Sequence, residues 1–312
     1  MRITVTGGAG FIGGNLCQLL SEKDWVDEII ALDDLSTGFA DYLKGVAATF
    51  IEGSILDNSA LDEAFAGADA VVHLAARPSV PRSIANPTTS HEVNTTGTVR
   101  VLEAVRRHAI RHLIVASSSS VYGANPTLPK HEELAPAPLS PYAATKLATE
   151  AYALAWGNSY EIEVLAFRFF NVFGPLQPAG HPYAAVVPVF VDAALAGRPL
   201  PVHGDGRQTR DFTFVGSVTA VLADALKRKV VWPRPVNLAF GTRTSLIELI
   251  SLLEKAVGRS LERDHQPPRP GDVRDSQADQ TLLASLVPDI VSVPLEVGLR
   301  ATVDWFRRSQ IA

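Results

Sequence analysis

A glycine-rich turn that follows a short apolar run constrains this 312-residue sequence more than any other feature. Residues 3–6 have the length and composition of a buried strand, and residues 11–21 carry apolar side chains at helical spacing. Between them lies a G-x-G-x-x-G motif at residues 8–13. Glycine also recurs at every third position, as Gly7, Gly10 and Gly13. Such glycines permit a tight turn and let a pyrophosphate approach the N-terminus of the following helix. The chain is therefore predicted to open with a strand, a phosphate-binding turn and a helix.

An acidic residue at the end of the next predicted strand supports this interpretation. Asp33 follows the apolar residues 28–32, about 20 residues beyond the glycines, which is the interval expected for a carboxylate that binds a ribose hydroxyl. A carboxylate there would repel the additional phosphate of NADP, so NAD is the predicted cofactor. A structural turn with an unrelated aspartate is the competing interpretation, because glycine turns are common.

Short apolar runs alternate with helical patterns, which predicts a parallel sheet covered by helices on both faces. After residue 171 proline and glycine become frequent, and residues 209–237 have the pattern of a return to the sheet. We predict an α/β fold: a Rossmann-type doubly wound parallel sheet that binds NAD (residues 1–170 and about 212–240), and a smaller α/β C-terminal domain that binds substrate (about 171–211 and 241–312). The expected strands lie at residues 3–6, 28–32, 69–74, 113–116 and 163–167, and the expected helices at 11–21, 95–108, 142–156 and 245–257.

The overall composition narrows the class of partner. Hydrophobic residues make up 46% of the chain, enough for a large core, and the formal net charge is -5. A mildly acidic chain is a poor candidate for nonspecific binding to nucleic acid or membrane phosphate. No apolar stretch is long enough to cross a bilayer, and no metal site is predicted. The single cysteine, Cys17, is expected to be buried, and the cytoplasm is the expected location because no signal segment is visible.

A tyrosine and a lysine four residues apart supply candidate proton-transfer chemistry. Tyr142 and Lys146 lie on one face of the predicted helix at residues 142–156. A phenol titrates near about 10, so a nearby ammonium and a positively charged nicotinamide are expected to lower the pKa of Tyr142. A run of serines at residues 117–120 follows a predicted strand, at the end where ligands bind in parallel sheets. Each pattern also occurs by chance in helices and loops, but their order after the glycine turn favours one active site.

These motifs together resemble the extended short-chain dehydrogenases/reductases, specifically the branch of nucleotide-sugar epimerases. The resemblance runs from Arg2 to about Asp279. Beyond the glycine turn, the serine run and the tyrosine–lysine helix, it is carried by residues 32–38, 73–76, 94–97, 121–123, 168–175, 210–212 and 269–273.

The resemblance implies a role for many individual residues. The implied catalytic residues are Ser118, Tyr142 and Lys146. The implied NAD-binding residues are Gly7, Gly10, Phe11, Ile12 and Gly13 in the turn; Asp33, Asp34, Ser36, Thr37 and Gly38 near the adenosine; Ser54 and Ile55 near the adenine; and Leu74, Ala75, Ala76, Asn94 and Phe170, with Tyr142 and Lys146, on the nicotinamide side. The implied substrate-binding residues are Asn171, Arg210 and Arg269 at the diphosphate, Val202 and His203 at the uracil, Asp272 at the uridine ribose, and also Ser79, Ser118, Gln177, Val187 and Ser276.

Several positions depart from the family pattern. Ser54 stands where an aspartate is usual, so a hydrogen bond near the adenine is expected to change. Leu176 stands where arginine is common, and Pro78 where some relatives have lysine. Residues 216–217, Gly-Ser, replace a more acidic pattern whose loss the sequence does not explain.

Residues near the implied catalytic serine narrow the choice among the reactions known for this branch. Dehydratases and decarboxylases of this branch carry an acid just before the Val-Tyr-Gly motif, whereas this chain has Ser119 and Ser120. UDP-glucuronate 4-epimerases usually have threonine where Asn171 stands. The resemblance therefore implies NAD-dependent 4-epimerisation of a UDP-hexose, UDP-glucose or UDP-galactose, and the small Ser276 beside the sugar leaves room for the N-acetyl group of UDP-GlcNAc or UDP-GalNAc.

Other functions and assemblies stay open at this stage. The alternatives are a UDP-glucuronate 4-epimerase, a reductase with exchangeable cofactor, or a non-catalytic NAD-binding sensor on the same fold. The resemblance also implies a homodimer, paired through the helices at residues 95–108 and 142–156. Their apolar faces would equally fit burial within one subunit.

Overall fold

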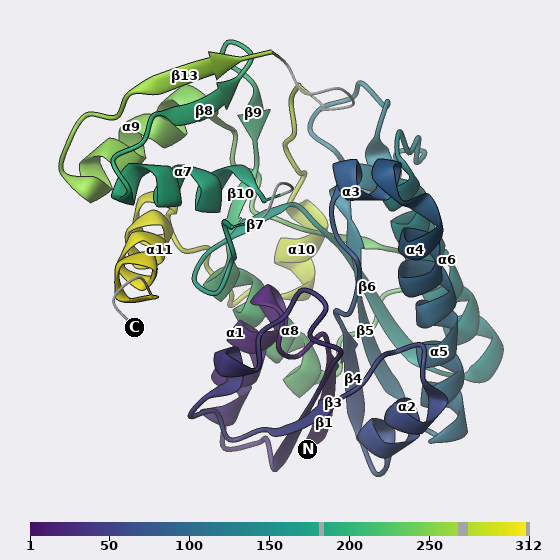
Figure 1. Ribbon diagram of the computed structural model, residues 1–312. Coiled ribbons are helices and arrows are strands. Elements are labelled where there is room, and N and C mark those ends of the chain that lie inside the picture. The colour runs from purple at the N-terminus through teal and green to yellow at the C-terminus, as the bar shows by residue number, and fades with distance from the viewer. Residues whose placement is uncertain (181–183, 268–273, 310–312) are drawn as a thin grey trace.

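Seven parallel strands form the central sheet of the computed structural model, which describes residues 1–180, 184–267 and 274–309. The order across the sheet is β11-β6-β5-β4-β1-β2-β3, so the chain builds one half outward from β1 and then the other half from β4 (Figure 1). Such a reversal creates a crevice at the carboxyl ends of the strands. The strands are β1 (Arg2–Thr6), β2 (Glu28–Asp33), β3 (Thr49–Glu52), β4 (Ala70–His73), β5 (His112–Ser118), β6 (Glu163–Phe169) and β11 (Val236–Leu238).

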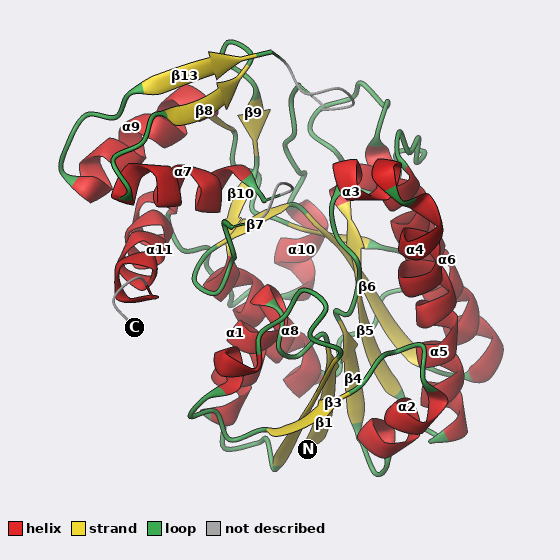
Figure 2. Ribbon diagram, in the orientation of Figure 1, coloured by secondary structure: helices red, strands yellow, loops and turns green. Residues whose placement is uncertain are grey.

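Helices cover both faces of this sheet (Figure 2). One face carries α1 (Phe11–Ser21) and α8 (Val215–Arg228), and the other carries α2 (Asn58–Phe65), α5 (Gly97–Arg107) and α6 (Pro141–Tyr160). Neighbouring residues of one strand point to opposite faces: Ile29 joins the first apolar cluster and Ile30 the second. Burial on both faces explains the nearly continuous apolar runs of the strands. The predicted doubly wound parallel sheet is confirmed.

Most predicted elements are present with small shifts at their ends. The helix α1 has the predicted bounds, and the five predicted strands differ from the expectation by one or two residues at an end. The helix α6 is longer than predicted, because Ser140 caps its start by accepting a hydrogen bond from the Ala143 N–H (3.2 Å) and a left-handed Glu161 (φ 55°) ends it. The predicted helix at residues 95–108 is divided into a π-helical turn, η2 (Glu92–Thr96), and α5.

The short elements of the first half were not predicted. They are β3, α2, α3 (Val80–Ala85) and α4 (Pro87–His91). Four to eight residues give too few turns or alternations for a clear period. Cys17 is buried as expected, and burial raises the pKa of its thiol to about 12.

A smaller lobe lies beside the carboxyl ends of the strands, at the upper left of Figure 1. Its helices α7 (Val186–Leu195), α9 (Leu246–Val257) and α11 (Leu295–Ser309) pack around an apolar cluster that includes Phe190 and Phe306. Three two-stranded sheets complete it: β7 (Asn171–Phe173) with β10 (Phe212–Phe214), β9 (Thr209–Arg210) with β12 (Thr244–Ser245), and β8 (Leu200–His203) with β13 (Arg263–Gln266).

One late segment packs away from this lobe. The helix α10 (Thr281–Leu286) contacts β11, and Leu283 and Val287 belong to the apolar cluster of the large sheet. These residues therefore pack with the large sheet, although the sequence analysis placed all of residues 241–312 in the smaller domain. The chain then returns to the smaller lobe through α11.

The unexplained Gly-Ser pair at the start of α8 has a structural role. The Ser217 hydroxyl accepts a hydrogen bond from the Val293 N–H (2.9 Å), just before α11. A Cβ atom at Gly216 would lie 2.7 Å from the Phe214 ring. Ser217 thus holds α8 to the segment that leads back to the smaller lobe, and Gly216 leaves room for the Phe214 ring.

Candidate functional site

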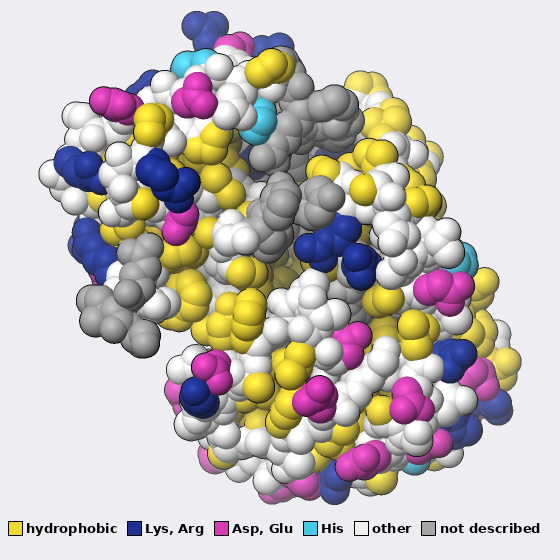
Figure 3. All heavy atoms as spheres, viewed as in Figure 1, with side chains coloured by type: hydrophobic (Ala, Val, Ile, Leu, Met, Phe, Trp, Pro, Cys, Tyr) yellow, Lys and Arg dark blue, Asp and Glu magenta, His cyan; other side chains and the backbone are white. Residues whose placement is uncertain are grey.

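Three adjoining cavities open at the carboxyl ends of the central strands. The dinucleotide cavity, about 500 Å³, extends from the glycine turn past Asp33 to Tyr142. The sugar-side cavity, about 260 Å³, contains Ser118 and Ser276, and the outer cavity, about 250 Å³, lies wholly within residues 171–246. Asn171 lines all three, so they share walls. Figure 3 shows the hollow between the two lobes, with basic side chains at its edge.

The glycine turn leaves no space for side chains. Gly7 has a left-handed backbone (φ 73°), and a Cβ atom at Gly13 would lie 2.0 Å from the Gly7 carbonyl oxygen. Gly10 is the N-cap residue of α1 and has no side chain to satisfy the first N–H groups of that helix. The helix start therefore presents backbone donors and its positive dipole end to the cavity.

Asp33 lies at the carboxyl end of β2 and is almost fully buried. Its carboxylate accepts hydrogen bonds from the Ala9 N–H (3.1 Å) and the Leu35 N–H (2.9 Å). Burial raises the pKa of Asp33, and these two hydrogen bonds oppose that rise. The carboxylate is held rigidly at the cavity wall, as a ribose-binding acid must be. Together the turn, the helix start and Asp33 fit a dinucleotide.

Most residues implied for NAD binding are brought together by the fold. Those that line the dinucleotide cavity are Gly7, Gly10, Phe11, Ile12, Gly13, Asp33, Asp34, Ser36, Thr37, Ile55, Leu74, Ala75, Ala76, Tyr142, Lys146 and Phe170. Gly38 lies behind the wall, where a Cβ atom would be 2.7 Å from the Ala9 carbonyl oxygen. Ser54 is also outside the lining: its hydroxyl accepts a hydrogen bond from the Leu56 N–H (3.2 Å).

Asn94 does not line the dinucleotide cavity, although it was predicted on the nicotinamide side. It is buried in the π-helical turn η2, and its amide holds the backbone of Arg77 through two hydrogen bonds (2.6 and 3.2 Å). It also donates to the Thr145 hydroxyl (3.0 Å) on α6. Asn94 therefore joins the loop after β4 to α6 from behind the cavity. A π-helical turn often marks such a functional position.

The three implied catalytic residues meet at the end of β5. Ser118 ends that strand, and Tyr142 and Lys146 lie in the first two turns of α6. A hydrogen bond joins the side chains of Ser118 and Tyr142. The Lys146 ammonium donates to the Ala116 carbonyl oxygen (2.7 Å).

Burial governs the titration of these groups in the protein alone. Burial raises the pKa of Tyr142, and the hydrogen bond with Ser118 only partly opposes this rise. Burial also lowers the pKa of Lys146 to about 8, which weakens the positive charge expected to act on the phenol. Desolvation therefore dominates the pKa of Tyr142 in the protein alone, and the predicted lowering, which also requires a charged nicotinamide, stays a prediction.

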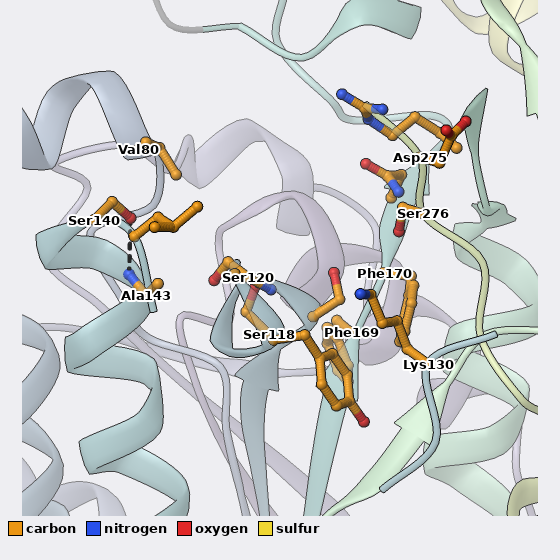
Figure 4. Close-up of a pocket in the computed structure, with 16 residues that line it drawn as sticks. Val80, Ser118, Ser120, Lys130, Ser140, Ala143, Phe169, Phe170, Asp275 and Ser276 are labelled. Carbon is orange, nitrogen blue, oxygen red and sulfur yellow. Dashed lines mark hydrogen bonds between the residues drawn. The ribbon is translucent and has the colours of Figure 1, made fainter. Parts of the chain in front are cut away.

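The sugar-side cavity is lined by Ser118, the implied catalytic serine. In Figure 4, Ser118 and Ser120 lie between the start of α6, marked by Ser140, and the segment that carries Asp275 and Ser276. The Ser276 N–H donates to the Thr209 carbonyl oxygen (3.1 Å), which fixes this segment against β9. The implied residues Ser118, Phe170, Asn171, Arg210 and Ser276 all line this cavity.

Arg210 separates the sugar-side cavity from the outer cavity and lines both. Its guanidinium donates to the carbonyl oxygens of Thr209 (2.9 Å) and Arg274 (3.0 Å). These bonds hold a cation at the junction of two cavities. An arginine fork placed there suits a diphosphate.

The outer cavity brings Asn171, Gln177, Val187 and His203 together. Val202 does not join them: its side chain is fully buried in the apolar cluster of the smaller lobe, so only its backbone could face a ligand. Strand geometry explains this, since neighbouring side chains of β8 point to opposite faces. Ser79 lines the dinucleotide cavity instead, and Arg269 and Asp272 lie outside the described residues.

The other departures face different surroundings. Pro78 lines the dinucleotide cavity. Leu176 packs over α1: a Cβ atom at Gly14 would lie 3.0 Å from its Cδ1 atom. The neighbouring Asn15 donates to the Pro175 carbonyl oxygen (2.9 Å), so this loop ties the cofactor helix to the smaller lobe.

Sequence reasoning missed several cavity residues. Lys130 and Leu139 line the sugar-side cavity, as do Asp275 and Val80. Lys130 is 4% exposed and donates to the Asn125 carbonyl oxygen. It lies in a loop with no periodic pattern, so no local signal identifies it; Asp275 could have been inferred from its neighbour Ser276. Across the described ranges, no His, Cys, Asp and Glu cluster suits a metal ion, and no helix there has the length and apolar character to span a membrane.

The doubly wound fold and these cavities fit a dinucleotide-binding protein. Sequence comparison gives the family: the chain belongs to the NAD dependent epimerase/dehydratase family, whose model matches residues 3–239. A UDP-glucose 4-epimerase from Mycolicibacterium smegmatis is 38% identical over 315 residues, which cover 98% of this chain and 99% of the relative.

Two solved structures extend the comparison. The UDP-N-acetylglucosamine 4-epimerase from Methanobrevibacter ruminantium, in complex with UDP-N-acetylmuramic acid, has a TM-score of 0.93 at 33% identity and covers 99% of this chain and 98% of its own. The UDP-glucuronic acid 4-epimerase from Bacillus cereus, in complex with UDP-glucuronic acid and NAD, has a TM-score of 0.91 at 29% identity, covering 99% of this chain and 100% of its own. These three proteins are all named 4-epimerases, and their names give different sugars.

Proposed function

We propose that this protein is an NAD-dependent UDP-hexose 4-epimerase that transiently oxidises its sugar at C4. One observation carries the proposal: Ser118 lines both the dinucleotide cavity, together with Tyr142 and Lys146, and the sugar-side cavity, together with Ser276. A sugar in the second cavity would therefore adjoin both the proton-transfer groups and the cofactor site. The relationship to three 4-epimerases supports the same reaction.

The residues divide into a cofactor set and a proton-transfer set. Gly7, Gly10 and Gly13 would hold the pyrophosphate of NAD, and Asp33 a ribose. NAD, when bound, supplies a hydride acceptor and a positively charged ring. Tyr142 takes the proton of the sugar 4-hydroxyl while Ser118 donates a hydrogen bond to the same oxygen.

Lys146 would stabilise the deprotonated, phenolate form of Tyr142. Burial raises the pKa of this phenol in the protein alone, so the phenolate needs a cation nearby. Lys146 lies one helical turn along α6, on the same face as Tyr142. Its ammonium donates to the Ala116 carbonyl oxygen within the cavity wall, which keeps the charge near the phenol.

The nucleotide end of the substrate would occupy the outer cavity. Arg210 and Asn171 would hold the diphosphate, with Gln177, Val187 and His203 around the uridine. With the nucleotide anchored there, the sugar could turn about its phosphate linkage and present its other face to the cofactor site. NAD, when bound, would accept the hydride of C4 and give it back, and Tyr142 would return the proton to the 4-oxygen. The small Ser276 leaves room beside the sugar, so we propose that N-acetylated UDP-hexoses are accepted.

Product analysis tests this proposal directly. Purified protein is incubated separately with UDP-GlcNAc, UDP-glucose and UDP-glucuronate, without added reductant, and the products are followed by NMR. We expect the 4-epimers of the first two. Tyr142→Phe is the matched control: it should abolish turnover while leaving NAD bound after gel filtration. An active Tyr142→Phe protein, or no epimer from any sugar, would refute the proposal.

The same experiment separates the alternatives. Conversion of UDP-glucuronate alone would assign the protein to the activity named for the Bacillus cereus structure. A parallel reaction with added NADH tests for a reductase, which would consume the NADH and give a reduced sugar product. Bound NAD without conversion of any UDP-sugar would indicate a non-catalytic sensor.

We also propose that the protein is a homodimer paired through α5 and α6, and that it works in the cytoplasm. Tyr152 and Tyr160 on α6 are 40% and 46% exposed. Trp156 lies between them, edge-on to the Tyr152 ring and tilted against the Tyr160 ring (5.8 and 5.6 Å between centroids). An aromatic row of this kind is favoured at interfaces. Light scattering of the wild type and of Tyr152→Glu would test the dimer, and a monomeric wild type would rule it out; cell fractionation would test the location.

A further inference from the structure

An ion pair lies buried directly behind the catalytic residues. Glu150 follows Lys146 by one turn on α6, and Arg168 lies on β6. Two hydrogen bonds join them, from Nε to Oε2 (3.0 Å) and from Nη2 to Oε1 (2.6 Å). The two side chains are only 4% and 3% exposed. Neither residue lines any of the three cavities.

The pair is bonded to the backbone segments that carry the catalytic groups. The Glu150 carboxylate accepts a third hydrogen bond, from the Ser117 hydroxyl (2.7 Å). Ser117 immediately precedes Ser118, and its hydroxyl also lies 3.2 Å from the Lys146 carbonyl oxygen. A single carboxylate therefore connects the end of β5, which carries Ser118, to the helix that carries Tyr142 and Lys146.

Arg168 extends the network to the sugar-side cavity. Its guanidinium lies over the Tyr122 ring, 4.7 Å from the centroid. The Tyr122 hydroxyl donates to Asn237 (2.7 Å), whose amide in turn donates to the Lys130 carbonyl oxygen (2.8 Å). Tyr122 and Lys130 line the sugar-side cavity.

Stability alone is a weak reason to bury such a pair. Removing two charges from water costs several kcal/mol per ion, and apolar residues of similar volume are often equally or more stable. The cost is higher here because Arg168 Nη1 has no hydrogen-bond partner within the described part of the chain. What an apolar pair could not provide is directional bonding to Ser117 and to Tyr122.

We propose that Glu150 and Arg168 are positioning residues for the epimerase reaction, which set the distance and orientation between Ser118 on β5 and Tyr142 and Lys146 on α6. They act through Ser117 and through the register of α6 on β5. This role rests on the proposed function only for its activity assay. Misplacement of reacting groups by about 1 Å can cost about 100-fold in rate, which sets the expected effect.

A double variant separates positioning from stability. Arg168→Met alone leaves a buried carboxylate unpaired, so it should lower both the melting temperature and kcat. In Glu150→Leu/Arg168→Met no charge is left unpaired, and the melting temperature should return close to that of the wild type. If the pair positions the catalytic groups, kcat should stay about 100-fold below wild type with KM changed less than about 3-fold. The exposed pair Arg228–Asp224 provides the control: Arg228→Met should leave kcat and KM unchanged.

A spectroscopic readout makes the test independent of turnover. The Tyr142 phenol is titrated by its ultraviolet absorbance, as the difference between each protein and its Tyr142→Phe counterpart. In the double variant the titration should shift, because Ser118 and Lys146 no longer face the phenol as before. If the double variant does not fold, Glu150→Gln replaces it. This variant keeps the shape of the side chain but leaves Arg168 charged and unpaired, so its melting temperature should fall, while kcat and the phenol titration should change as in the double variant.

The outcomes are distinct. A stable variant with wild-type kcat and an unshifted phenol titration would overturn the positioning role. A wild type that epimerises no UDP-sugar would overturn the proposed function instead, and the phenol titration would still decide whether the pair positions Tyr142.

Discussion

Replacing Lys146, the proposed active-site lysine, should stabilise the protein while abolishing its activity. Burial lowers the pKa of Lys146 from 10.5 to about 8, which corresponds to roughly 3 kcal/mol against the charged form. A methionine of similar length removes this cost. It also removes the hydrogen bond to the Ala116 carbonyl oxygen, which offsets about 1 kcal/mol. We therefore expect Lys146→Met to raise the free energy of unfolding of the cofactor-free protein by about 2 kcal/mol at pH 7.

The sign of the pH dependence gives a second check. Because the lysine of the unfolded chain holds its proton more tightly, the burial cost is fully present below pH 8 and is relieved as the pH rises from about 8 toward 10.5. The advantage of Lys146→Met should therefore shrink over that range.

Urea unfolding of NAD-free protein at pH 7 and at pH 9.5 measures both effects. Lys44→Met is the control, since Lys44 is exposed and pairs with Asp41 across one helical turn; it should change the free energy of unfolding by less than about 0.5 kcal/mol. A Lys146→Met protein that is less stable than wild type at pH 7, or whose advantage does not change with pH, would refute this reasoning. The same variant should show no measurable epimerisation, a trade of stability for activity that is common at active sites.

Three further changes have defined outcomes. Gly13→Ala would place a Cβ atom 2.0 Å from the Gly7 carbonyl oxygen, so the purified protein should lose bound NAD, measured by its absorbance after gel filtration; full retention would contradict the turn geometry. Ser276→Tyr should lose conversion of UDP-GlcNAc and keep that of UDP-glucose, since the added ring fills the sugar-side cavity; equal loss of both sugars would show that Ser276 does not set this preference. Asn94→Ala removes three buried hydrogen bonds, so chemical denaturation should show a loss of about 2–4 kcal/mol, and a loss below about 1 kcal/mol would mean that Asn94 does not hold η2 to α6.

The sequence best predicted those parts of the molecule whose structure depends on residues nearby in the chain. The helix α1 has its predicted bounds because the glycine turn fixes its start and an apolar stripe fixes its face. The glycines, Asp33 and Tyr142 were placed correctly on one cavity because the order of strands in such a sheet brings their carboxyl ends together.

Long-range contacts explain the failures. Asn94 was expected at the cofactor because of its family motif, but its amide is taken up by Arg77 and by Thr145, 51 residues away. Val202 points into the core of its lobe, because the face of β8 that carries it packs against the distant helices α7 and α9. The bond between Glu150 and Arg168 had no sequence signal, because the two residues share no motif and meet only when α6 packs on the sheet.

The division of the cavities along the chain has a consequence for how new specificities arise. Every residue of the outer cavity follows position 170, whereas Ser118, Tyr142, Lys146 and the glycine turn all precede it. Asn171, which lines all three cavities, marks the boundary between these two parts of the chain. Substitutions in the later segment can therefore alter how the nucleotide end of the ligand is held while Ser118, Tyr142 and Lys146 stay unchanged, so nucleotide recognition can drift in one lobe without changing the residues proposed for proton transfer.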